Sequence, residues 1–165
     1  MTAVRDVNGT DVYNAVSLGI ESDGTRKVAV SSPKAWCDAL GIGTIIDHPI
    51  ATTGEASISH NTVTNLTSVS IPAGVWVING KINYKSGGTA GAAVACYLGT
   101  SASGNQLAQT IAANVSNGNT NINVTCIKKF TSATTVYLNA LHLAGTTKWA
   151  VAPTSLIQAV KVASV

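Results

Sequence analysis

Acidic side chains are missing from most of this 165-residue chain. All seven Asp and Glu residues lie in the first 55 positions, together with four Lys and Arg residues, so that segment has a net charge of 4 − 7, or −3. The other positions hold six Lys and no acid, a net charge of +6. Glycosidase acid pairs, EF-hands and carboxylate metal cages need several anionic oxygens close together. Residues 56–165 have no Asp or Glu side chain, so none of these sites is expected among them. The charge change predicts a boundary between an N-terminal segment, 1–55, and a domain at 56–165.

Charged residues make up only 10% of the chain and aromatic residues only 5%. A nucleic-acid groove needs clustered basic residues beside rings on which bases stack, and the lysines here are dispersed, so no nucleic-acid partner is predicted. No apolar run approaches the roughly 20 residues of a membrane span, and no basic-plus-apolar leader opens the sequence. We therefore expect a protein that is made in a cytoplasm and binds no membrane.

Cysteine is scarce as well, and its spacing excludes the usual metal and redox motifs. Cys37, Cys96 and Cys126 are odd in number and form no C-x-x-C pair. This predicts buried thiols that pack as small apolar side chains, instead of a disulfide framework or a zinc site.

The first 55 residues contain short elements that bury little surface by themselves. Alternation of apolar and polar residues predicts strands within residues 12–20 and 27–30. A Ser-Pro pair, which caps and opens helices, predicts one short helix over residues 33–40 that ends at Gly41. Such a segment is expected to lie along its own domain, along a sister subunit or along another protein.

Apolar and polar residues alternate along residues 56–165, between clusters of Gly, Ser and Asn, at the spacing of an all-β sandwich. The pattern predicts about eight antiparallel strands, the number in a jelly roll. They are placed at residues 57–61, 66–71, 75–85, 92–99, 107–113, 120–130, 134–143 and 156–163. The predicted fold is all-β, with an extended arm that carries one short helix before a jelly-roll β-sandwich.

The Asn79-Gly80 pair, inside the strand predicted at 75–85, has two interpretations. It is the strongest short hairpin signal, and a two-residue turn there would place Val77 and Ile82 on one face. It also fits the middle of one long strand whose inward face includes Trp76. The long strand is favoured, because a hairpin would have arms of only four residues.

Three segments carry a resemblance to a known family. They are Val69-Ser-Ile-Pro-Ala-Gly-Val-Trp-Val-Ile-Asn-Gly-Lys-Ile-Asn-Tyr84, the Thr-Val-Tyr-Leu-Asn-Ala run at 135–140, and the closing strand at 155–163. Over residues 57–165 this pattern resembles the tumour necrosis factor-like jelly roll found in phage virion proteins. The resemblance implies a homotrimer whose sheets pack about a threefold axis, made in the host cytoplasm and located in the virion. The family hosts unrelated roles, so the fold alone settles no function.

The acidic N-terminal segment is similar to the attachment arms of phage decoration and fibre proteins. This similarity implies that the arm binds the major capsid protein through apolar anchors at Val16, Leu18, Ile20 and Trp36. The expected function is a capsid decoration (cement) protein on the virion surface, because a fibre normally needs a longer shaft. The alternative, from a different class, is a receptor-binding or tip module of a tail or head fibre.

No enzyme and no cofactor are predicted. Asp47-His48 would need a nucleophile, and the chain has no Gly-x-Ser-x-Gly elbow. His48, His60 and His142 could form a metal site on a trimer axis. His142, however, shares the parity of inward-facing residues on its strand, which favours a hydrogen-bonded core or interface histidine without a metal.

Two further positions are candidates for surface recognition. Lys128 and Lys129 could bind an acidic partner, or they could protect a strand edge against aggregation. The second role is favoured. Trp149, expected in a loop at 145–153, fits an exposed anchor of an interface or a ring buried beneath that loop.

Overall fold

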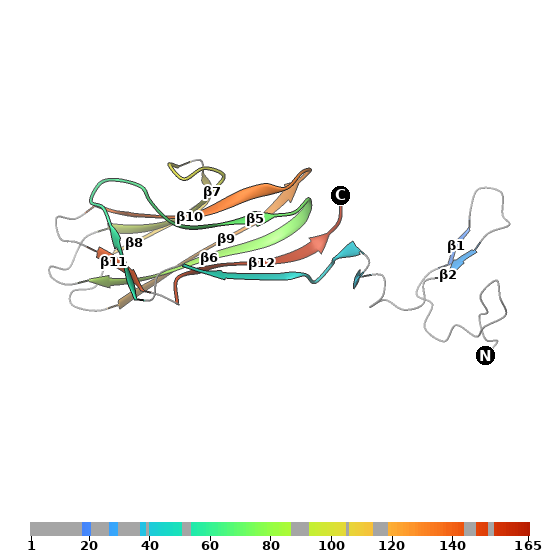
Figure 1. The fold of residues 1–165 in the computed structure, drawn as a ribbon, viewed down its shortest axis with the longest axis horizontal. Coiled ribbons are helices and arrows are strands. Elements are labelled where there is room, and N and C mark those ends of the chain that lie inside the picture. Colours follow the sequence, from blue (N-terminus) through green and yellow to red (C-terminus); the bar gives the residue numbers. More distant parts are fainter. Residues whose placement is uncertain are drawn as a thin grey trace. The chain divides into compact units, whose positions relative to one another are not determined.

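The computed structural model describes residues 18–20, 27–29, 37–38, 40–50, 54–86, 93–104, 106–113, 119–143, 148–151 and 154–165 (Figure 1). The chain divides into two compact units, Met1–Thr44 and Ile45–Val165. No helix among the described residues is long and apolar enough to cross a membrane.

The first unit contains a two-stranded antiparallel sheet. Strands β1 (Leu18–Ile20) and β2 (Lys27–Ala29) pair with Leu18 opposite Ala29, within the two predicted strand segments. Of the predicted helix, the described residues Cys37, Asp38 and Leu40 are helical, and its predicted start lies outside the described residues.

The helix ends at Gly41, as predicted, and a pair of hydrogen bonds explains why. Gly41 has φ +64°, which only glycine adopts at little cost. The Gly41 amide donates to the Asp38 carbonyl at 3.0 Å, and the Ile42 amide donates to the Cys37 carbonyl at 2.7 Å. This is the Schellman arrangement, which satisfies carbonyls that a helix end leaves open.

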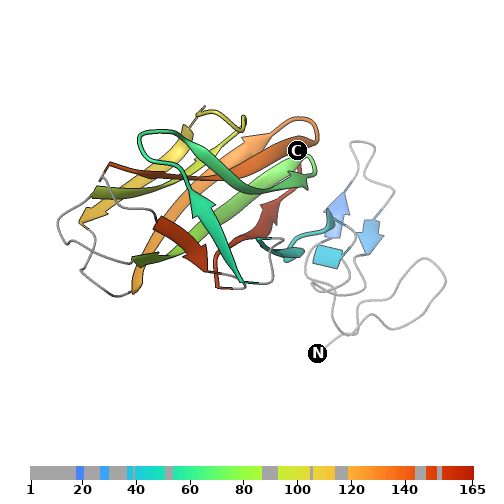
Figure 2. The ribbon, with the colours of Figure 1, turned by 60° about the vertical axis from the view of Figure 1, so that its left-hand side comes forward.

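The second unit is a sandwich of two antiparallel sheets (Figures 1 and 2). The larger sheet is built on β6 (Gly74–Ser86), which pairs along one edge with β9 (Asn119–Phe130). Its other edge is shared by two strands, β12 (Leu156–Ala163) along residues 75–81 and β11 (Lys148–Val151) along residues 84–86. Outside these lie β3 (Ile45–Pro49), which pairs with β12, and β4 (Glu55–Ile58), which pairs with β11.

The smaller sheet has four strands in the order β5, β10, β7, β8. Their bounds are Thr64–Ile71 for β5, Thr134–His142 for β10, Ala93–Gly99 for β7 and Gln106–Ala113 for β8. All the pairs are antiparallel. The predicted jelly-roll β-sandwich is therefore confirmed, and each of the eight predicted strands overlaps an observed one.

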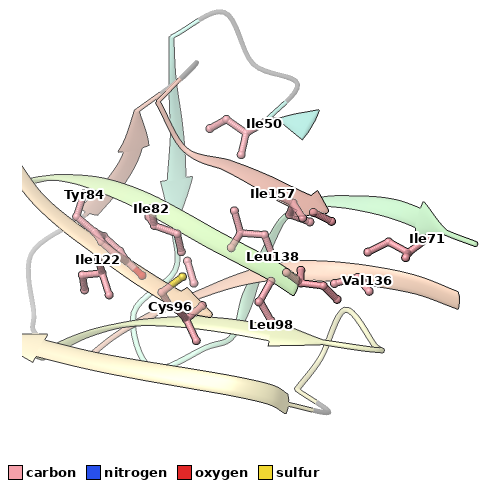
Figure 3. Close-up of a cluster of buried hydrophobic side chains, with 14 of the residues drawn as sticks. Ile50, Ile71, Ile82, Tyr84, Cys96, Leu98, Ile122, Val136, Leu138 and Ile157 are labelled. Atoms are coloured by element: carbon pink, nitrogen blue, oxygen red, sulfur yellow. The ribbon is translucent and has the colours of Figure 1, made fainter. Parts of the chain in front are cut away.

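The inward faces predicted from alternation meet between the two sheets (Figure 3). Trp76, Ile78, Ile82 and Tyr84, the predicted inward face of β6, are all buried. The same inward face of the larger sheet includes Ile122 and Val124 of β9 and Ile157 and Ala159 of β12. The buried side chains of β7 and β10 in the smaller sheet face them, and these are Val94, Cys96, Leu98, Val136, Leu138 and Ala140. Burial of this apolar surface is the main stabilising term for a sheet that is apolar on one face.

Asn79 and Gly80 lie in the middle of one 13-residue strand, as favoured from the sequence. Asn79 pairs with Thr125 of β9, and Gly80 pairs with Val124 on one side and Ile157 on the other. The hairpin signal is overridden because both edges of the strand are paired there.

Three expectations need correction. The sandwich begins at Ile45 instead of Ala56, because β3 completes the larger sheet beside β12. Trp149 lies on strand β11, between β4 and β6, instead of in a loop. Of the three cysteines, which are all free, only Cys96 is buried, while Cys37 and Cys126 are half-buried.

Candidate interaction surface

A row of four apolar side chains crosses the outer face of the larger sheet. Pairing places Ile45 of β3 opposite Val160 of β12, Val160 opposite Val77 of β6, and Val77 opposite Ile127 of β9. Neighbouring strand residues such as Ile78 point into the core, so these four point away from it. We call these four residues the apolar row.

The two ends of the apolar row are its most exposed parts. Ile45 is 71% exposed and Ile127 is 70% exposed, while Val160 is 37% exposed and Val77 is half-buried between its neighbours. Val162, beyond Val160 on β12, is 43% exposed. Opposed β-branched side chains are favourable in a sheet, but exposed ones still leave apolar surface in water that a partner could bury.

The next row on the same face is polar and nearly uncharged. It consists of Asp47, Gln158, Asn79 and Thr125, in that order across the sheet. The Thr125 hydroxyl donates to Asn79 Oδ1 at 3.1 Å, so part of this row is already hydrogen-bonded within the chain. An apolar row beside polar residues of which only Asp47 carries a charge is typical of a protein contact, since charged residues are depleted where interfaces are buried.

The lysine pair of the sequence lies at the end of β9, which pairs only with β6 among the described residues. Lys128 and Lys129 are both exposed, and Lys129 lies opposite Val75, one alternate position beyond Ile127. Lys129 therefore flanks the apolar row.

The other sequence candidates are scattered. Leu18 and Ile20 lie on β1 at alternate positions, and Val16 and Trp36 lie outside the described residues. Asp47 and His48 are neighbours on β3, so their side chains point to opposite faces and do not form a dyad.

The three histidines do not converge on one point. His142 is fully buried, as its parity predicted, and its Nε2 lies 2.9 Å from the Ile58 carbonyl oxygen. The rings of His60 and His142 are 5.4 Å apart, whereas His48 lies on β3 opposite Ile157. Among the described residues no three His, Cys, Asp or Glu side chains form a metal-binding group.

The apolar row was not among the sequence-predicted site residues. The available signal was an apolar residue at the outward position of a strand, such as Ile127 after Asn121, Asn123 and Thr125. The sequence did not show that four such residues align, because their register depends on which strands are neighbours.

No protein-family model matches this chain, and no curated protein matches it. Solved structures do match. The structure of Eiger TNF from S. frugiperda is 14% identical, with a TM-score of 0.55 over 75% of this chain and 95% of that chain. The T=1 particles derived from infectious bursal virus are 14% identical, with a TM-score of 0.50 over 93% of this chain but only 37% of that chain. At these identities the comparisons show the fold, a jelly roll similar to that of a TNF and to part of a virus particle protein.

Proposed function

We propose that this chain is a phage virion structural protein, a capsid decoration (cement) protein that binds the major capsid protein as a homotrimer. The observation that carries the proposal is the apolar row, an exposed apolar stripe on a fully formed sheet. The apolar row suits association with another protein surface, and its hydrocarbon side chains offer no group for catalysis. A jelly roll similar to those of a TNF and a virus-derived particle supports the same class of function.

The geometry of the apolar row supports self-association about an axis. Its ends, Ile45 and Ile127, lie on opposite border strands of the sheet, so each end is free to contact a different neighbouring copy. Full burial of a Val or Ile side chain contributes about 1.5–3 kcal/mol to the free energy of association. In a trimer the contact between neighbouring rows forms three times, which favours a closed ring of subunits.

The attachment role falls to the N-terminal arm, here residues 1–44 because β3 and β4 belong to the sandwich. This arm has five carboxylates and four Lys and Arg, a net charge of 4 − 5, or −1, against 6 − 2, or +4, for residues 45–165, and its anchors are apolar. Apolar side chains supply the affinity of such a contact, while charges mainly set register and association rate.

Copy number in purified virions tests the proposal. Quantitative mass spectrometry should find hundreds of copies per particle, and an antibody to this chain should label the head. A few tens of copies or fewer, with label on a fibre, would favour the receptor-binding alternative. Absence from the virion would refute both.

A further inference from the structure

One nitrogen of the buried His142 ring has no hydrogen-bond partner among the described residues. The ring is fully buried on β10, and its Nε2 lies 2.9 Å from the Ile58 carbonyl oxygen, so Nε2 carries the proton and donates. In the neutral ring the other nitrogen, Nδ1, then keeps a free lone pair. Nδ1 is buried and accepts no hydrogen bond from the residues that the structure describes. A lone pair left open in a core is destabilising and calls for a ligand.

His60 is held beside the His142 ring by the backbone. Residue 60 forms an isolated parallel bridge to residue 142, and the next amide, that of Asn61, donates to the His142 carbonyl at 3.0 Å. Asn61 has φ +52°, a left-handed conformation that asparagine tolerates better than most residues. The Thr62 hydroxyl donates to the His60 carbonyl at 3.3 Å. These contacts fix the position of His60 although it lies outside the strands.

The spacing of the two rings fits a shared metal ion. Their centroids are 5.4 Å apart and their planes are tilted by 37°. Two imidazoles bound to one tetrahedral ion at metal–nitrogen distances of about 2.1 Å have ring centres roughly 5 Å apart. A backbone carbonyl that accepts a hydrogen bond from the other ring nitrogen is a usual second partner of a metal-binding histidine, and Ile58 supplies it here.

We propose that His60 and His142 bind one divalent transition-metal ion, of the class that prefers imidazole ligands, such as Zn²⁺ or Cu²⁺. His142 contributes Nδ1, and His60 closes the site from the exposed side, where water completes the coordination. The sequence analysis considered these two histidines only together with His48 on a trimer axis, and it favoured a His142 without a metal. The parallel bridge between residues 60 and 142 instead brings this pair together within one chain. The inference does not depend on the proposed virion function.

Metal titration of the full chain tests the site. After removal of metal with EDTA and dialysis, calorimetry with Zn²⁺ should give one ion per chain. The Tm should rise by roughly 4 °C when free Zn²⁺ reaches about ten times its dissociation constant. With Cu²⁺, electron paramagnetic resonance should show two nitrogen ligands.

Three variants make the test specific. His60→Asn removes the exposed ligand without disturbing the core, and it should abolish the Tm rise and lower the nitrogen count. His48→Asn changes a half-buried histidine on another strand, and it should behave as the parent. A Cys37→Ser, Cys126→Ser background removes the half-buried thiols as competing ligands. Zinc binding that is absent in the parent, unchanged in His60→Asn, or lost in His48→Asn would overturn the proposal.

Discussion

At Gly80 the two sheets approach each other more closely than a side chain permits. A Cβ atom at this position would lie 2.9 Å from Leu138 Cδ1 and 2.9 Å from Leu98 Cδ2. Both leucines are fully buried on the opposite sheet, so neither has room to move. The glycine is therefore required by packing, although in sequence it resembles the second residue of a turn.

Gly80→Ala is expected to destabilise the sandwich by about 1–3 kcal/mol, the usual cost of overpacking a core. Urea denaturation followed by circular dichroism would measure it. Gly54→Ala is the matched control, because no atom of the described residues lies within 4 Å of its Cβ position, and its effect should be close to zero. Equal effects in the two variants would contradict the close approach at Gly80.

The Cys96 thiol contacts the same residue, with Sγ 3.8 Å from the Gly80 carbonyl oxygen. Burial raises the pKa of this thiol from its ordinary 9.0 to about 12. The neutral thiol thus stabilises the folded chain fully below pH 9, and this contribution is lost as the pH rises toward 12. Burial also raises the pKa of the Tyr84 hydroxyl, so ionisation of this group likewise lowers the stability of the folded chain at high pH.

Stability should therefore fall above pH 9, with the Cys96 share on the order of 2 kcal/mol by pH 10.5. Denaturation at pH 8.0 and pH 10.5 would measure the decline. A Cys96→Val variant should lose less stability between the two pH values than the parent. An identical decline in both proteins would show that the thiol does not contribute.

At the scale of elements, the apolar row depends on four strands being in register. Substitution of one exposed end, Ile127→Asp, leaves the core untouched but places a charge in the proposed contact. We expect the homotrimer, about three times 16.7 kDa, to dissociate to monomers in native mass spectrometry. Ile111→Asp is the control, because Ile111 is 56% exposed on β8 of the other sheet and should leave the trimer intact. A trimeric Ile127→Asp protein would exclude this face as the subunit contact.

Strands with clear alternation could be predicted from the sequence, and those that depend on distant partners could not. The inward residues of β6, including Trp76 and Ile82, alternate for so long that the strand and its buried face follow directly. β3 is only five residues long, and its pairing with β12 is set by residues far along the chain. For the same reason, neither the alignment of Ile45 with Ile127 nor the neighbourhood of His60 and His142 could be predicted.

At the scale of the whole molecule, the structural unit boundary and the charge boundary do not coincide. The compact sandwich starts at Ile45, while the last carboxylate is Glu55 on β4. Glu55 pairs with Lys85 of β6, so it belongs to the sandwich. A deletion that tests the attachment arm should therefore end at residue 44.

Deletion of residues 1–44 is expected to leave a folded sandwich that no longer enters virions. The reason is that the sandwich has its own core, while the arm carries the proposed capsid contact. Cooperative melting would show that the fold persists, and immunoblots of purified particles would measure incorporation. Deletion of residues 1–55 should melt earlier, because it also removes β3 from the edge of β12. Normal incorporation of the 45–165 protein would place attachment on the sandwich itself.

The position of β12 has a consequence for the order of folding during synthesis. Among the described strands, β3 pairs only with β12, and β12 also fills the edge of β6 along residues 75–81. Residues 156–163 leave the ribosome long after β3 and β6, so the larger sheet cannot close until these residues have emerged. Until then β6 keeps half of one edge open to other nascent chains, and pairing between residues so distant in sequence is slow. Emergence of residues 156–163 is therefore the event that allows the larger sheet to form.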